Sequence, residues 1–120
     1  MNDAGGFVEI GDNVQLGAMN FVTGQGGLII GDSVLIAPMV SLVANEHGFE
    51  DTTLPVREQA ETPRSISVGG HGWIGTGVTV LGGVHIGDHV VIGANSVVTR
   101  DIESYCVAVG VPARVIRRLG

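Results

Sequence analysis

The chain has 120 residues, of which 44% are hydrophobic and only 4% aromatic, and it contains 20 glycines and 4 prolines. Its formal net charge of −6 argues against nucleic acid as the main partner, because binding to phosphates requires a basic surface. No apolar run reaches the roughly 20 residues of a membrane-spanning helix, and residues 1–6 lack the basic start and apolar core of a secretion signal. We therefore expect one cytoplasmic domain over residues 1–120.

Apolar residues spaced by six begin in the first third of the chain. The spacing slips by two within residues 23–27, where the glycines predict a widened turn. Asn20 stands where other units have valine, so its amide is expected to hydrogen-bond along a corner or to contact a ligand. The residues in phase are Ile10, Leu16 and Val22 before the slip and Ile30, Ile36 and Leu42 after it.

The repeat stops after Leu42, and residues 45–65 form a predicted loop. The loop contains His47, five acidic residues and two prolines, with no six-residue phase. A long interruption in a compact repeat usually serves binding or catalysis. The loop is therefore the first place to look for a functional site.

The strictest repeat follows, with a β-branched residue at every sixth position over five steps. A helix repeats near 3.6 residues and a strand face near 2, so neither explains this spacing. The pattern predicts an all-β hexapeptide β-helix, in which these residues point inward and stack on those of the next coil. Such a solenoid exposes its flanks, which we expect to bury against other subunits. The repeated residues are Val68, Ile74, Val80, Ile86, Ile92 and Val98.

The tail, residues 99–120, has no repeat and is predicted to cap the open end. Residues 110–113 mark a turn, and residues 115–119 suit either a last strand or a short helix. Four of the six arginines lie in the last 21 positions. They form either a binding patch or ordinary solvated surface. The single cysteine, Cys106, excludes an intramolecular disulfide and is expected to be buried.

Three parts of the chain, in this order, resemble the hexapeptide-repeat O-acetyltransferases, in particular those of sugars and surface polysaccharides. They are the loop residues 45–59, the segment Gly72-Trp73-Ile74-Gly75, and the ending at residues 98–101 and 109–116. The resemblance implies a single-stranded left-handed parallel β-helix of triangular section, assembled as a homotrimer with active sites between subunits. The left hand runs against the usual rule for parallel crossovers and rests on the resemblance alone.

The same resemblance implies acetyl-CoA as the acetyl donor, no metal ion, and a sugar or glycan hydroxyl as the acceptor. His47 matches the catalytic histidine, and an imidazole suits this work because its pKa lies near neutrality. Glu50 and Asp51 would orient that imidazole or bind the acceptor, unless they are only solvated. Trp73 would pack on the acceptor or the donor's pantetheine arm, or anchor a subunit interface.

The donor-binding residues are also carried over from the family. Small side chains on the wall of the groove would let the pantetheine approach, although a β-helix wall needs small residues in any case. Arginines would bind phosphate, because the guanidinium fork can hold it with two hydrogen bonds. The implied residues are Thr76 and Ala94 on the wall, Thr99 and Arg100 near the adenosine, and Arg114 and Arg117 at the phosphates.

Three departures leave the acceptor open. The chain begins almost at the first coil, whereas maltose-type enzymes place a helical segment before it. Their acidic acceptor-binding residue has no counterpart here, where Gln25 stands nearest, and Asn20 is close to, but not in register with, their acceptor-binding asparagine. Two other functions also remain open. One is a non-catalytic trimeric module, and the other is a metal enzyme on the same fold, similar to the hexapeptide-repeat carbonic anhydrases, which need three histidines. The spacings of His71, His85 and His89, at 14 and 4, do not place all three at one position of the repeat.

Overall fold

The structure is a computed structural model and describes residues 6–120. The chain winds through three faces in turn, so the neighbours within each sheet come from successive coils. The first face contains β1 (Val8–Ile10), β4 (Leu28–Ile30), β9 (Ile66–Val68) and β12 (His85–Ile86). The second contains β2 (Gln15–Leu16), β5 (Leu35–Ile36), β10 (Trp73–Ile74), β13 (Val91–Ile92), β15 (Cys106–Gly110) and β16 (Ala113–Arg118). The third contains β3 (Phe21–Thr23), β6 (Ser41–Val43), β11 (Thr79–Val80) and β14 (Val97–Val98).

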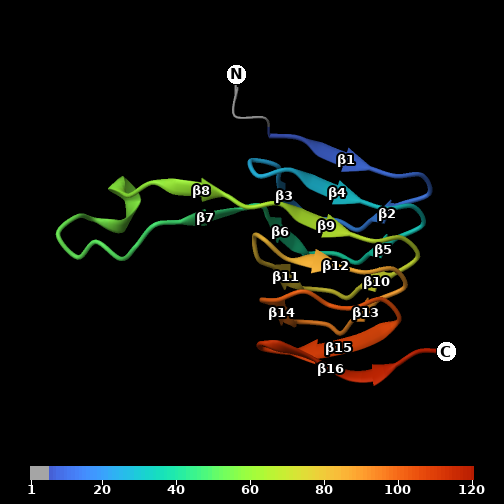
Figure 1. Cartoon of the computed structure of the whole chain (residues 1–120). Helices are drawn as coiled ribbons and strands as arrows, with labels where there is room; N and C mark the ends of the chain where they lie inside the picture. The colour runs from blue at the N-terminus through green and yellow to red at the C-terminus, as the bar shows by residue number, and fades with distance from the viewer. Residues whose placement is uncertain (1–5) are drawn as a thin grey trace.

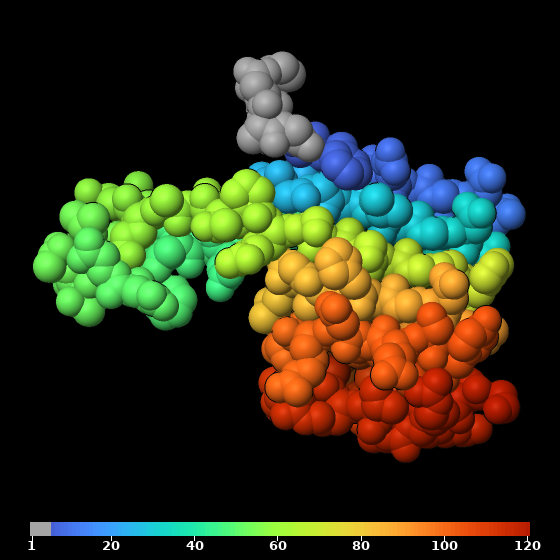
Figure 2. Space-filling view, in the orientation of Figure 1, coloured from blue at the N-terminus to red at the C-terminus, as the bar shows by residue number. Residues whose placement is uncertain are grey.

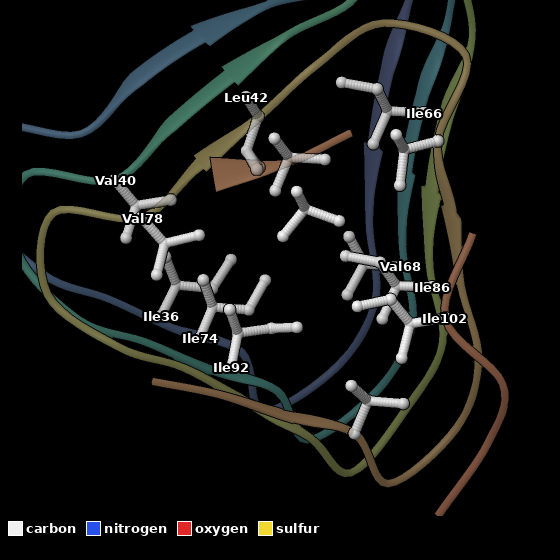
Figure 3. Packing of buried hydrophobic residues seen from close by; sticks show 14 of the residues in the cluster. Ile36, Val40, Leu42, Ile66, Val68, Ile74, Val78, Ile86, Ile92 and Ile102 are labelled. Carbon is white, nitrogen blue, oxygen red and sulfur yellow. The ribbon is translucent and has the colours of Figure 1, made fainter. Parts of the chain in front are cut away.

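Stacking of identical rungs explains this arrangement. Within the regular repeat, residues 18 apart pair in parallel, as Ile74 does with Ile92. Ile74 is buried, while its neighbour Trp73 points outward and is half exposed, as alternation along a strand requires. Figure 3 looks into the core and shows Ile36, Ile74 and Ile92 in one column. The six-residue spacing therefore predicted the core correctly.

We number the corners by the faces that they join, as corners 1–2, 2–3 and 3–1. At corner 1–2, successive coils place Asn13, Ser33, His71, His89 and Tyr105 in the left-handed region, with φ between 54° and 66°. Most L-residues avoid this region. Backbone hydrogen bonds from coil to coil hold the corner, such as the one from the His89 N–H to the Gly70 carbonyl at 2.8 Å.

An arm replaces the loop predicted at residues 45–65. Two strands, β7 (Asn45–His47) and β8 (Glu61–Pro63), pair antiparallel, and a 3-10 turn, η1 (Val56–Glu58), lies near the tip. The arm leaves the prism at corner 3–1, between β6 and β9, and projects away from the body (Figures 1 and 2). The shorter slip at residues 23–27 is a widened turn at the same corner, as predicted, with Gly27 at φ +89°.

The two ends of the stack differ. At the carboxyl end β16 is a strand, which settles the choice between strand and helix, and it pairs antiparallel with β15 beneath the last coil. Cys106 is buried there, as expected. At the other end the inward side chains of the first coil, Val8, Ile10 and Leu16, remain 45%, 45% and 47% exposed. Over residues 6–120, no helix has the length and apolar character needed to cross a membrane.

Candidate active site

The arm carries a cavity of about 320 Å³. It is lined by residues 46–51 on the outgoing half of the arm and by Gln59, Thr62 and Arg64 on the returning half. His47 lines it at the end of β7, beside the exposed ring of Phe49. The cavity therefore combines an imidazole, an aromatic surface and several charged groups.

The orientation of His47 is set by the residue that follows it. Its Nδ1 lies 2.9 Å from the Gly48 carbonyl oxygen. A carbonyl only accepts hydrogen bonds, so Nδ1 carries the proton in this contact. In the neutral ring Nε2 then holds the lone pair, and it is the nitrogen able to take a proton from another group.

Gly48 has a tight position between the two strands of the arm. Its N–H donates to the Ala60 carbonyl at 2.8 Å. A Cβ placed on Gly48 would lie 2.9 Å from that same oxygen, which is closer than real side chains approach. A side chain at this position would therefore force a shift between residue 48, whose carbonyl orients the imidazole, and the Ala60 carbonyl.

Gln59 braces the tip of the arm. Its Oε1 accepts from the Asp51 N–H at 3.1 Å, and its Nε2 donates to the carbonyls of Asp51 at 2.8 Å and Leu54 at 3.1 Å. The Gln59 side-chain amide thus joins the returning half of the arm to both ends of the turn at residues 51–54. The brace holds the cavity wall that carries Glu50 and Asp51.

The acidic residues of the cavity differ in their partners. Glu46 pairs with Arg64 at 3.1 Å in an exposed ion pair. Asp51 accepts hydrogen bonds from the Thr53 hydroxyl at 2.6 Å and N–H at 2.9 Å, which lower the pKa of its carboxyl. Glu50 makes no side-chain hydrogen bond or ion pair with residues 6–120. No such contact joins Glu50 or Asp51 to His47 within that range either, so acceptor binding stays a prediction for both acids.

A second cavity of about 300 Å³ lies where the arm meets the prism. Asn45 and Glu46 line it from the arm, and Leu81, Gly82 and Thr99 line it from corner 3–1. Thr99 is one of the predicted donor-binding residues, and the exposed Arg100 follows it. The structure thus brings this pair to the base of the arm that carries His47.

Three of the remaining predicted residues lie at corner 2–3 or beside it. Thr76 and Ala94 occupy equivalent places in successive coils, and the Asn95 N–H donates to the Thr76 carbonyl at 2.8 Å. Arg114 pairs with Val109 at the end of β15 nearest this corner. The third face therefore separates this group from Thr99 and from the arm.

The last three predicted residues are Asn20, Trp73 and Arg117. Asn20 is in the first coil at corner 2–3, where its amide donates to the Ala37 carbonyl at 3.2 Å and its Oδ1 has no partner in the described chain. Trp73 lies on the outer side of the second face, with 50% of its surface exposed. Arg117 lies in β16 opposite Val107. Neither Arg114 nor Arg117 forms an ion pair with residues 6–120, whereas Arg118 bonds to Glu103 at 3.0 Å, which raises the pKa of Arg118.

The three histidines of the metal alternative do not share one position of the repeat, as their spacings predicted. His71 and His89 are 18 residues apart, which is one coil, so they share corner 1–2, and His89 stacks on Tyr105 with ring centroids 5.9 Å apart. His85 lies on a strand rather than in a turn, with its Nδ1 2.7 Å from the Ser67 hydroxyl. Within the part of the chain that the structure describes, no cluster of three side chains suits a metal ion.

Comparison with known proteins places these features in context. Residues 66–100 match the family described as bacterial transferase hexapeptide (six repeats). The galactoside O-acetyltransferase of Escherichia coli (strain K12) is 47% identical over 90 residues, which cover 75% of this chain and 43% of that protein. This chain spans between 37% and 61% of the length of the curated relatives that it matches.

Solved structures agree with this likeness. A hexapeptide-repeat acetyltransferase from Vibrio cholerae O1 biovar eltor, complexed with acetyl coenzyme A, superposes with a TM-score of 0.87 at 30% identity. The match covers 94% of this chain and 61% of that one. A maltose O-acetyltransferase from Clostridium difficile 630 superposes with a TM-score of 0.68 at 32% identity, over 95% of this chain and 67% of that one.

Proposed function

Because this chain belongs to the hexapeptide-repeat transferase family of left-handed parallel β-helices, we propose that it is an acetyl-CoA-dependent O-acetyltransferase. The acceptor would be a hydroxyl group of a sugar or polysaccharide precursor. One observation carries the proposal. The imidazole of His47 is held through Nδ1, and its Nε2 makes no hydrogen bond with residues 6–120 beside a cavity of about 320 Å³.

The proposed reaction is a direct transfer. The acceptor oxygen attacks the carbonyl carbon of the donor's thioester while Nε2 of His47 removes the hydroxyl proton. The resulting tetrahedral intermediate collapses by breaking its carbon–sulfur bond. The departing sulfur takes the proton from the imidazolium, which restores neutral His47 and leaves free CoA and the acetyl ester.

The predicted donor-binding residues have side chains that suit acetyl-CoA. Thr76 and Ala94 are small residues at one corner. The guanidinium groups of Arg114 and Arg117 form no ion pair with residues 6–120 and suit phosphates. Thr99 and Arg100 would hold the adenosine end from corner 3–1. The acetyl coenzyme A bound to the V. cholerae relative supports this assignment of the donor.

The proposed site needs more than one copy of the chain. The donor-binding residues at corner 2–3 and the arm with His47 lie on opposite sides of the third face. Two neighbouring subunits of a homotrimer would bring one corner of each together, which supports a shared site. Light scattering tests this arrangement, and a monomer would leave the proposed site half built. The cytoplasmic location stays a prediction from the sequence.

The acetyl transfer can be tested directly. Purified protein given acetyl-CoA and a panel of sugars is expected to release free CoA thiol with at least one of them. His47→Asn should lower turnover by roughly 10²-fold or more, on the usual scale for a general base, with acetyl-CoA binding retained. His71→Asn, at a corner away from the arm, is the matched control. Equal turnover in His47→Asn and the parent would remove His47 from the mechanism.

Two further measurements test the assignment of the donor-binding arginines and the competing function as a metal enzyme. Arg114→Ala and Arg117→Ala are expected to weaken acetyl-CoA binding in calorimetry, because each removes a cation near the phosphates. Metal analysis of the purified protein addresses the competing function. Stoichiometric zinc that is needed for activity would overturn the acetyltransferase assignment.

A further inference from the structure

Resting on the function proposed above, we propose that the arm selects acceptors by charge. The favoured acceptors are neutral or amino-bearing glycans, and those with a negative charge near the reacting hydroxyl are disfavoured. The observation is an imbalance of charge around His47. Three carboxylates and one guanidinium line the cavity, which leaves two negative charges in excess while the imidazole is neutral.

The excess charge belongs to Glu50 and Asp51. Glu46 is neutralised by its ion pair with Arg64. Among residues 6–120, the Asp51 carboxylate accepts hydrogen bonds only from neutral groups, the hydroxyl and the N–H of Thr53. Glu50 has no cationic partner in residues 6–120, is exposed, and lines the cavity. Both carboxylates therefore belong to residues that line the cavity beside His47, where their charge acts on whatever enters.

The arginines outside the cavity do not offset this negative charge. The arginines without ion pairs among the described residues are Arg57, Arg100, Arg114 and Arg117. Arg57 lies in η1, outside the residues that line the cavity, and the other three are assigned to the donor. The charges without an ionic partner that line the cavity are therefore negative. An anionic acceptor would meet repulsion in the cavity, whereas a neutral one would not.

The size of the effect follows from Coulomb's law. Like charges about 6 Å apart change an equilibrium constant roughly threefold in bulk water and about a hundredfold at the effective dielectric constant of a protein surface. An exposed cavity lies between these limits, so we expect roughly tenfold discrimination at low salt. Salt should weaken it, because the screening length falls from about 10 Å at 0.1 M to about 3 Å at 1 M.

The test compares three glycosides of one accepted sugar, with carbamoylmethyl, carboxymethyl and 2-aminoethyl groups as the aglycone. All three keep every sugar hydroxyl, and the first two are nearly the same size. We expect kcat/KM for the carboxymethyl glycoside to be roughly tenfold below that of the carbamoylmethyl glycoside at low salt, and near parity at 1 M NaCl. The 2-aminoethyl glycoside should match or exceed the neutral one.

Matched variants assign the effect to the cavity. Glu50→Gln should reduce the discrimination about threefold or more by removing one of the two charges. Glu58→Gln makes the same change in η1, outside the cavity, and should leave the ratio unaltered. Equal kcat/KM for the acidic and neutral glycosides at low salt, or equal effects of the two variants, would overturn the inference.

Equilibrium binding separates this inference from the function on which it rests. Calorimetric titration of the same three glycosides should give the same order of affinity. If that order is found but no acetyl group is transferred, the proposed activity fails and the charge selectivity stands. If acetyl groups are transferred without preference, the activity stands and the charge selectivity fails.

Discussion

Replacing Gln59 by methionine should loosen the tip of the arm without unfolding the prism. Methionine keeps the length of the side chain but removes the three hydrogen bonds to Asp51 and Leu54. At about 0.5 kcal/mol each, the low end expected for an exposed site, the loss is about 1.5 kcal/mol. That corresponds to roughly a tenfold larger open population of the turn. The residues of the arm lie outside the buried core cluster, so the melting temperature should hardly change.

Limited trypsin digestion measures this opening, because Arg57 lies in η1 at the braced tip. Cleavage after Arg57 should be roughly tenfold faster in Gln59→Met, provided that opening and closing are fast compared with cleavage. Gln25→Met is the matched control, since the Gln25 side chain is exposed and makes no hydrogen bond in the described chain. Unchanged cleavage in Gln59→Met, or an equal increase in the control, would refute the assigned role of the brace.

Three further predictions concern the arm and the core. Gly48→Ala should lower kcat and leave acetyl-CoA binding intact, because the added Cβ would displace the carbonyl that orients the general base; steady-state kinetics and calorimetry would show this. Ile74→Ala should lower the free energy of unfolding by about 2–5 kcal/mol, whereas Ile116→Ala, at an exposed site, should lower it far less in the same denaturant titrations. Thr53→Val should raise the pKa of the Asp51 carboxyl toward its ordinary value, since the Thr53 hydroxyl is the main cause of its lowering; an NMR titration that shows no shift would contradict this.

The prism could be predicted because its core depends on a local pattern. An inward residue such as Ile74 is followed six positions later by another, and its stacking partner lies 18 positions away. The strands of the arm carry no such pattern. Asn45 pairs with Pro63 in the ladder of the arm, and its side-chain amide donates a hydrogen bond of 2.7 Å to Glu61, which no hydrophobic period reveals. The tail strand β16 was ambiguous for a similar reason, because its pairing with β15 is settled only in three dimensions.

The candidate site was only partly predictable. His47 could be found because the residues around it resemble a known loop, but the groups that orient it and support its surroundings could not. A glycine directly after His47 was a weak signal that residue 48 has a structural role. Gln59 gave none, because its bonds to backbone five and eight residues earlier depend on the shape of the turn. The shared column of His71 and His89 was present in the sequence, since 18 residues are three hexapeptides, and it emerges when the spacing is counted in whole coils.

The stacked coils also act as a ruler. Adjacent rungs lie about 4.8 Å apart, and whole coils separate the arm, which leaves after β6, from the arginines that follow β15. Inserting or deleting one 18-residue turn would shift those arginines along the axis by one rung and leave the cross-section unaltered. In such a scaffold, the distance along the axis between a phosphate-binding end and a catalytic group changes in steps of one rung. The length of ligand that fits between them therefore changes in the same steps.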